Sequence, residues 1–254
     1  MAEKFARLDK YVAESAGITR KEAKTALSGG RVQVNGAVCK NGDYKVSSSD
    51  AVTLDGKSLV AEDFLYLMLH KPAGVVSATE DARDKTVLDL VREQSAKDAD
   101  CIAQGGYFLG KREVFPVGRL DKDTEGLLLL TDDGGLAHQL LSPKKHVDKV
   151  YFARLLGEVP ADAAERFAEG IPVGQDYKAL PAKLEVLSSE NGISEVHITL
   201  REGKFHQVKR MCHEIGCEVT YLKRISMGNL VLDENLKPGE CRRLTEDELK
   251  GLKS

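Results

Sequence analysis

Four consecutive leucines, Leu127 to Leu130, constrain the fold of this chain more than any other short feature of its sequence. Pro116 and Gly118 stand before the run and Gly134-Gly135 stands after it, so turns are expected on both sides. A short apolar run between turns is typical of a buried strand. The alternating short strands and helices around it show no regular strand–helix–strand repeat, which favours a mixed α+β domain over a parallel doubly wound one.

The composition is that of an ordinary globular chain, with 254 residues, 42% hydrophobic and 30% charged. No apolar run approaches the ~18 to 20 residues that cross a bilayer, and the first residues lack the apolar core of a signal peptide. We therefore expect a cytoplasmic protein with no membrane partner. The odd number of scattered cysteines favours reduced thiols over a disulfide framework, and no second ligand pair completes a zinc site. The cysteines are Cys39, Cys101, Cys212, Cys217 and Cys241.

The formal net charge is −3, but the charges are distributed unevenly. Residues 1–58 carry 10 Lys and Arg against 7 Asp and Glu, and the remainder carries 27 against 33, which together give the totals of 37 and 40. A basic head on an acidic body indicates a local contact with a polyanion. On charge alone, chance unevenness of solvated faces is the alternative.

The first 60 residues are expected to form two helices and a small sheet. Apolar residues recur at helical spacing up to Gly17, and Thr19 followed by Glu22 is a capping box that begins a second helix. That helix is expected to bury Ala23, Ala26 and Leu27 and to end at Gly29-Gly30. The Asn35-Gly36 pair predicts a two-residue hairpin turn, and a further short strand, 51–54, closes the unit.

This pattern resembles the S4 RNA-binding domain over Phe5 to Leu59, most specifically in the strings RLDKYVAES and TRKEAKTALSGGRVQVNG. The resemblance implies that basic side chains of the helix pair and the adjoining turn contact structured RNA; ordinary exposed charges are the alternative. These side chains are Arg7, Arg20, Lys21, Lys24 and Arg31. We expect an S4-like domain over 1–60, a polar joint at Val60 to Asp63, and a second domain over 64–254 that begins with an apolar strand.

The densest cluster of chemically active side chains is GRLDKDTEGLLLLTDDG, residues 118–134. Its acids at 121, 123 and 125, followed by Gly126, match the opening of a calcium-binding EF-hand loop, but the preceding turn residues and the leucine strand exclude the flanking helices which that site needs. A carboxylate on a tight loop against a buried strand is well placed as a nucleophile or base, because the strand fixes it and the loop exposes it.

The same string resembles the catalytic motif of the RsuA/RluB family of pseudouridine synthases, and its aspartate matches Asp121. LMLHKPAGVVSA at 67–78, KVYFARL at 149–155 and EGKFHQVKRM at 202–211 agree with that family in order, so the resemblance covers nearly the whole chain. It implies a mixed, mostly antiparallel sheet flanked by helices. The segment from 222 to 249 is most similar to members that act on small-subunit ribosomal RNA, which implies a uridine of 16S rRNA, naked or in an assembly intermediate, as the substrate.

Isomerisation of uridine moves the base from its N1 bond to a C5 bond on C1′ of the ribose. It needs no redox change and no external group, so we expect no cofactor and no metal. By resemblance Asp121 is the essential carboxylate after the base is flipped; attack on the sugar and proton removal from the ribose both need it ionised. Tyr151 is implied to stack on the target base, with a core aromatic as the alternative. Lys204 is implied to be the basic partner of Asp121, with a phosphate contact or a solvated lysine as the alternative.

The resemblance gives the remaining side chains roles in RNA contact. Arg119 is implied to help extrude the target nucleotide, and Arg224 to touch RNA or Asp121. RNA-track residues are expected at Gln207, Lys209 and Arg210. His206 and His213 have no ligand partner at metal-binding spacing, which favours packing or RNA contact. All of these parts lie on one chain, so a monomer suffices. A large-subunit rRNA enzyme of the same family and a non-catalytic assembly factor stay open as alternatives.

Overall fold

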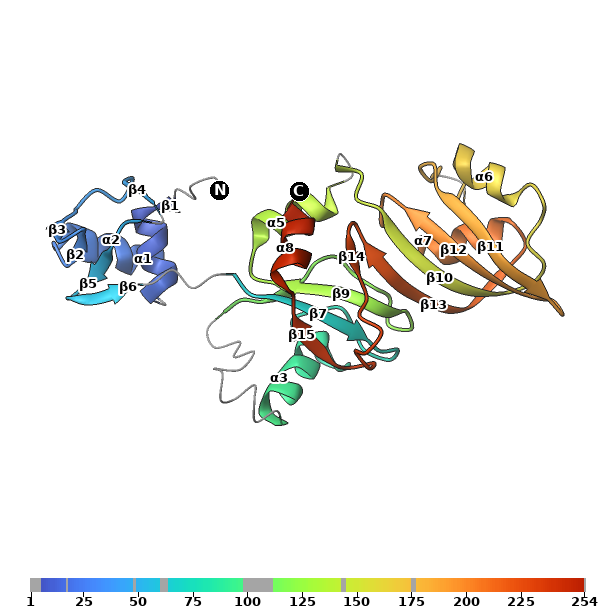
Figure 1. The fold of residues 1–254 in the computed structure, drawn as a ribbon, viewed down its shortest axis with the longest axis horizontal. Coiled ribbons are helices and arrows are strands. Elements are labelled where there is room, and N and C mark those ends of the chain that lie inside the picture. Colours follow the sequence, from blue (N-terminus) through green and yellow to red (C-terminus); the bar gives the residue numbers. More distant parts are fainter. Residues whose placement is uncertain are drawn as a thin grey trace. The chain divides into compact units, whose positions relative to one another are not determined.

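The computed structural model describes residues 6–16, 18–47, 49–59, 64–97, 112–142, 145–174 and 177–253. The chain divides into two compact units, Met1–Asp63 and Phe64–Ser254 (Figure 1). Gly17, Cys101 and the expected joint at 60–63 lie outside the described residues. None of the described helices is both long and apolar enough to span a bilayer.

The first unit contains a helix pair whose second member begins at the predicted capping box. The Thr19 side chain accepts a hydrogen bond from the backbone N–H of Glu22, whose carboxylate accepts one from the backbone of Thr19. Ala23, Ala26 and Leu27 are buried, as expected. The elements are β1 (Ala6–Arg7), α1 (Leu8–Ala16), α2 (Arg20–Ser28), β2 (Val32–Val34), β3 (Ala37–Val38), β4 (Lys45–Val46), β5 (Val52–Leu54) and β6 (Lys57–Leu59).

Two hairpins build the small sheet of this unit, in the order β3-β2-β5-β6. Asn35 (φ 51°) and Gly36 (φ 81°) form the predicted turn between β2 and β3, because two consecutive positive φ angles match the twist of paired strands. Asp55 and Gly56 also have positive φ angles and form a second turn of this kind, between β5 and β6. A further strand therefore follows the one expected at 51–54. The helices pack on this sheet through a core that includes Leu8, Val12 and Leu27.

The second unit is built on a nine-stranded sheet with the order β11-β12-β10-β13-β9-β7-β15, extended by β14 on β13 and β8 on β9. Among the described strands, only the β13–β9 pairing is parallel, so the sheet is mixed and mostly antiparallel, as expected. The strands are β7 (Tyr66–Lys71), β8 (Phe115–Pro116), β9 (Glu125–Thr131), β10 (Lys149–Leu156), β11 (Lys183–Glu190), β12 (Ile193–Leu200), β13 (Glu218–Met227), β14 (Leu230–Val231) and β15 (Cys241–Arg243). The helices are α3 (Val87–Lys97), α5 (Gly134–Leu141), α6 (Ala163–Glu169), α7 (Gln207–Glu214) and α8 (Glu246–Lys253).

The leucine run is the buried strand β9, covered on both faces. Leu128 and Leu130 belong to a core shared with α3, α6 and α7, whereas Leu127 and Leu129 belong to a second core shared with α5 and α8. In Figure 1, α5 and α8 lie on one side of β7 and β9, and α3 lies on the other. All four leucines are fully buried because alternate side chains of a strand enter opposite layers.

The two halves of the large sheet meet at Gly126. In the parallel pairing of β9 with β13, Glu125 lies opposite Lys223 and Gly126 opposite Arg224. A Cβ atom at position 126 would lie 2.2 Å from the carbonyl oxygen and 2.7 Å from the amide nitrogen of Arg224, and the φ angle of Gly126 is +104°. Only glycine permits both this approach and this conformation.

We expect Gly126→Ala to lower the free energy of unfolding of the second unit by on the order of 3 kcal/mol, because a methyl group must push the β13 backbone away at a strained φ angle. Urea denaturation followed by circular dichroism measures the change. Gly134→Ala is the matched control, since no atom lies within 4 Å of the added Cβ. Equal stability losses in the two variants would contradict this account of the junction.

Candidate active site

Asp121 lies on a tight loop between the buried Leu120 and the start of β9. Its side chain is 30% exposed, and its carbonyl accepts a hydrogen bond from the backbone N–H of Thr124 at 3.1 Å. The Ser77 hydroxyl, itself buried, donates to the carbonyl of Leu120 at 2.9 Å and accepts from its N–H at 3.1 Å. The backbone N–H of Gly74 donates to the carbonyl of Lys122 at 2.7 Å. The loop is therefore fixed by its neighbours while the carboxylate reaches solvent.

A buried lysine lies beneath this loop. Lys71, the last residue of β7, is fully buried, and its ammonium donates hydrogen bonds to the carbonyls of Pro72 (3.0 Å), Lys122 (3.3 Å) and Thr124 (2.7 Å). Burial lowers the pKa of Lys71 to about 8, although the nearby Asp123, Asp121 and Glu125 carboxylates oppose the shift. Sequence reasoning did not single out Lys71; the only signal was a lysine at the end of an apolar strand.

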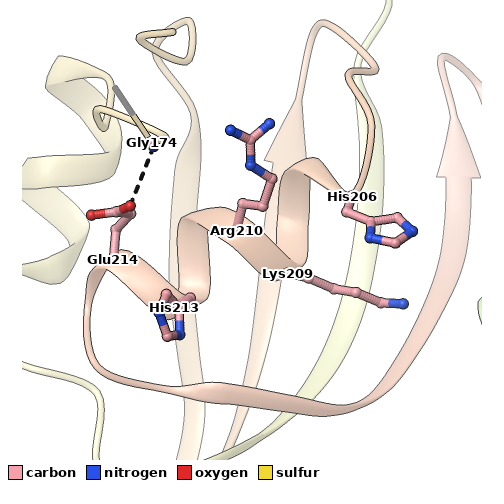
Figure 2. Close-up of a pocket in the computed structure, with 6 residues that line it drawn as sticks. All are labelled: Gly174, His206, Lys209, Arg210, His213 and Glu214. Carbon is pink, nitrogen blue, oxygen red and sulfur yellow. Dashed lines mark hydrogen bonds between the residues drawn. The ribbon is translucent and has the colours of Figure 1, made fainter. Parts of the chain in front are cut away.

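Two cationic or potentially cationic side chains approach the Asp121 carboxylate from α7 and the residue before it. Nε2 of His206 and Nζ of Lys209 each lie 3.7 Å from the same oxygen, Oδ2. Lys209 also donates to both carboxylate oxygens of Asp123, at 2.6 and 2.7 Å, and this contact lowers the pKa of Asp123. Figure 2 shows His206 and Lys209 projecting to the same side of α7.

The structure places Lys204 differently from the expectation that it partners Asp121. Lys204 is exposed, and its ammonium lies 5.7 Å from the centroid of the Tyr177 ring. Among the described residues, no ion pair joins Lys204 to Asp121; Lys209 occupies that position. The reason is local: α7 begins at Gln207, so Lys204 lies in the preceding loop and its direction does not follow the helix.

Gln207 is also placed differently from the expected RNA track. Its side chain is 4% exposed, and its amide nitrogen donates to Glu202 at 2.7 Å. Its amide oxygen accepts a hydrogen bond from the backbone N–H of Lys204 at 2.9 Å. Gln207 thus closes the loop 202–207 from the inside and has no free face for RNA.

Strand register brings Tyr151 and Arg224 into one row with the end of the Asp121 loop. Tyr151 on β10 lies opposite Arg224 on β13, which lies opposite Gly126 on β9. Tyr151 is 8% exposed and contributes to the core. Arg224 is 2% exposed, and its Nε donates to the Leu127 carbonyl at 2.8 Å. Its Nη2 is buried without a hydrogen-bond partner within the described part of the chain.

The remaining predicted residues of this unit lie at its surface or along α7. Arg119, three residues after Pro116, is exposed and makes no hydrogen bond or ion pair with other described residues. Arg210 donates to the Val173 carbonyl at 2.9 Å. A concavity of about 360 Å³ runs along this helix (Figure 2), with Gly174, His206, Lys209, Arg210, His213 and Glu214 as its lining.

In the first unit a buried carboxylate orders two of the predicted RNA contacts. Asp9 is fully buried and pairs with Arg7 at 3.1 Å and with Arg20 at 3.4 Å. The Arg7 guanidinium holds the pKa of Asp9 at about 2, so this aspartate stays ionised. Arg31 forms an exposed pair with Asp55. Lys21 and Lys24 are exposed and form no ion pair with other described residues.

The described cysteines are free thiols, at positions 39, 212, 217 and 241. Burial raises the pKa of Cys212 to about 12, so this thiol stays protonated. Within the ranges that the structure covers, no three or more His, Cys, Asp or Glu side chains gather as a metal site.

Two family models match this chain. The model of RNA pseudouridylate synthase matches residues 65–214, and the model of the S4 domain matches residues 6–52. The first match spans more than half of the chain and contains both the Asp121 loop and α7. The chain belongs to the RNA pseudouridine synthase family, as its motifs predicted, and it is an isomerase with an amino-terminal S4 domain.

Individual relatives agree along nearly the full length. The chain is 44% identical to the "uncharacterized RNA pseudouridine synthase YtzG" of Bacillus subtilis, over 96% of each chain. It is 41% identical to "ribosomal small subunit pseudouridine synthase A" of Vibrio cholerae, over 96% of this chain and 97% of the relative. A crystal structure of a pseudouridylate synthase superposes with a TM-score of 0.63 at 36% identity, covering 97% of this chain and 99% of that one.

The buried lysine under the loop predicts a pH dependence of stability. Lys71 has a pKa of about 8 in the native state, against 10.5 for an ordinary exposed lysine, so between these two pH values the unfolded chain holds a proton that the native state has released. The free energy of unfolding of the wild type, minus that of Lys71→Met, should therefore rise from pH 8 to 10.5. Urea titrations at several pH values measure it. Lys122→Met, an exposed lysine of the same loop, should show no such rise, and a flat difference for Lys71→Met would contradict the shift.

Proposed function

We propose that this pseudouridine synthase isomerises one uridine of small-subunit (16S) ribosomal RNA and that the Asp121 carboxylate is the reacting group. One observation carries the assignment of Asp121: its carboxylate is partly exposed on a fixed loop, and Lys209 and His206 both lie 3.7 Å from one of its oxygens. Both chemical routes require the ionised form of this carboxylate.

The reaction is balanced within the substrate. In one route the carboxylate attacks C1′ of the ribose as the bond from C1′ to N1 breaks, and the ester bond to C1′ breaks in turn when C5 of the turned uracil bonds to C1′. In the other route the carboxylate removes the proton at C2′ as the bond from C1′ to N1 breaks, and it returns that proton to C2′ when the bond from C1′ to C5 forms. In both routes C5 loses its proton and N1 gains one. The enzyme must retain the detached ring throughout. Tyr151 is proposed to lie against it, because a flipped pyrimidine needs a π surface in place of its lost neighbours.

The other side chains act around this carboxylate. Lys209 orients Asp121, while Lys71 holds the carbonyls of the loop from below. Arg224 is a candidate for a substrate contact because its Nη2 is buried without a partner inside the described ranges. Arg119 and Arg210, with their exposed or partly exposed guanidinium groups, are proposed to contact the RNA near the target.

The ribosomal target rests on the relatives and on the first unit. Relatives called ribosomal small subunit pseudouridine synthase A are 41% identical in Vibrio cholerae and 38% identical in Salmonella typhimurium, over 96% of this chain. The S4 domain supplies a second RNA contact on the same chain, which supports action as a monomer on structured rRNA or an assembly intermediate.

The first experiment maps pseudouridine across both rRNAs after incubation with the enzyme, by carbodiimide treatment and reverse transcription. We expect one new stop in 16S rRNA, and Asp121→Asn should reduce its rate of formation by about 10²- to 10⁴-fold or more, because an amide can neither attack nor accept a proton. Asp123→Asn is the matched control: it lies on the same loop and contacts the same Lys209, but it is 70% exposed. An undiminished signal in Asp121→Asn would refute the role of Asp121, and a stop confined to the large-subunit rRNA would refute the target.

The second experiment tests the RNA contact of the S4 domain. Removal of one true phosphate contact should lower the slope of log affinity against log salt by about 0.7 to 0.9. We expect Lys24→Ala to do so in binding titrations with a 16S rRNA transcript, whereas Lys183→Ala, an exposed lysine on β11 paired with Glu185, leaves the slope unchanged. If Lys24→Ala has the same slope as the wild type, Lys24 does not contact an RNA phosphate.

A further inference from the structure

Phe205 is the most exposed large hydrophobic side chain among the described residues, at 75%. Single exposed hydrophobic residues are common in globular proteins, so exposure alone indicates no function. Three further observations distinguish Phe205: a stacked neighbour, a left-handed backbone beside it, and its closeness to the proposed reacting carboxylate.

The Phe205 ring is stacked on the imidazole of His206. The ring centroids are 3.8 Å apart and the planes differ by 17°, so one face of the phenyl ring is covered. With three quarters of the side chain exposed, the other face is open. His206 has φ 50° and ψ 32°, a left-handed conformation that is costly for a residue other than glycine and that collects at functional positions. The loop therefore holds the rings of two consecutive residues face to face, whereas consecutive side chains of an extended chain point to opposite sides.

The stack leads directly to Asp121. Nε2 of His206 lies 3.7 Å from Oδ2 of Asp121, so the imidazole that stacks on Phe205 also approaches the carboxylate. One side chain, His206, therefore links the phenyl ring to the carboxylate. A nucleotide adjacent to the reacting one must lie near the same carboxylate, because a single phosphate joins consecutive nucleotides.

Basic residues stand on both sides of Phe205 in the sequence. Lys204 precedes it, and Lys209 and Arg210 follow on the first turns of α7. An apolar protein partner would need a wider apolar area than one ring. An aromatic ring among cations is instead the combination that binds single-stranded nucleic acid, where the ring stacks on a base and the cations attract the backbone.

We propose that Phe205, supported by His206, is a stacking platform for an RNA base that neighbours the target uridine once that uridine has left its helix. The inference rests on the proposed role of Asp121 as the reacting carboxylate, and it adds a binding residue that fixes the RNA beside the reaction. Phe205 acts by its π surface, so another ring can replace it and an aliphatic side chain of similar bulk cannot.

The absence of tryptophan from the sequence allows a direct test. Phe205→Trp introduces a single fluorescent indole at the platform, and Leu156→Trp introduces one at a distant position that is 54% exposed. Both full-length proteins are titrated with a 16S rRNA transcript and with a single-stranded oligouridylate. We expect RNA to quench the fluorescence of Phe205→Trp and to leave that of Leu156→Trp unchanged. No quenching at position 205, or equal quenching at both, would overturn the proposal.

Kinetics test whether the platform serves the reaction. We expect Phe205→Leu to lower kcat/KM by about 5- to 150-fold, the range of about 1 to 3 kcal/mol that base–aromatic stacking contributes. Phe205→Tyr should stay within about threefold of the wild type. The melting temperatures of both variants should match that of the wild type, since the ring is exposed. Wild-type kinetics in Phe205→Leu would overturn the proposal.

The two arms separate the failure of this inference from the failure of the proposed function. Quenching requires no turnover, so it reports on stacking even if no ribosomal uridine is converted. If the wild-type enzyme converts uridine but Phe205→Leu is as active as Phe205→Tyr, the proposed function stands and the stacking platform is refuted.

Discussion

The close approach of two backbones at Gly126 determines the geometry of the candidate active site. The Asp121 loop runs into β9, and α7 precedes β13 and packs on it. Because β9 and β13 are parallel, the segments that precede them enter from the same end of the sheet. The hydrogen bond from the Tyr221 hydroxyl to the Glu125 carboxylate, at 2.8 Å, ties the two strands just beside this junction. The β9–β13 pairing is only two residue pairs long, Glu125 with Lys223 and Gly126 with Arg224. This short pairing brings Asp121, which precedes β9, close to Lys209, which precedes β13.

Around that contact, basic side chains approach one carboxylate from two directions. Lys71 lies below the loop and is held by carbonyl oxygens, whereas Lys209 and His206 approach from the solvent side. The arrangement keeps the loop rigid through buried hydrogen bonds and leaves one face of Asp121 accessible. Preorganised charge of this kind is effective because it needs no rearrangement when a substrate arrives.

Local sequence signals predicted the local structure well. They did not predict which way a side chain points where that depends on the residue at which a helix begins. The capping box at Thr19, the Asn35-Gly36 turn and the buried leucine strand follow from short-range rules, and the structure contains all three. The choice between Lys204 and Lys209 as the neighbour of Asp121 depends on where α7 begins, which the buried Gln207 amide decides through contacts that spacing does not reveal. Lys71 was missed for a related reason: its partners are backbone carbonyls, which leave no trace in side-chain motifs.

The paired arginines of the S4 domain differ from its exposed lysines in how far their directions are fixed. Asp9 is buried and holds Arg7 and Arg20 in fixed directions before any ligand arrives, whereas Lys21 and Lys24 extend freely into solvent. Fixed guanidinium groups lose little further conformational entropy when they meet phosphates at the matching spacing, and they fit other spacings poorly. Mobile ammonium groups adapt to many backbones. The first unit thus carries both directed and mobile cationic groups.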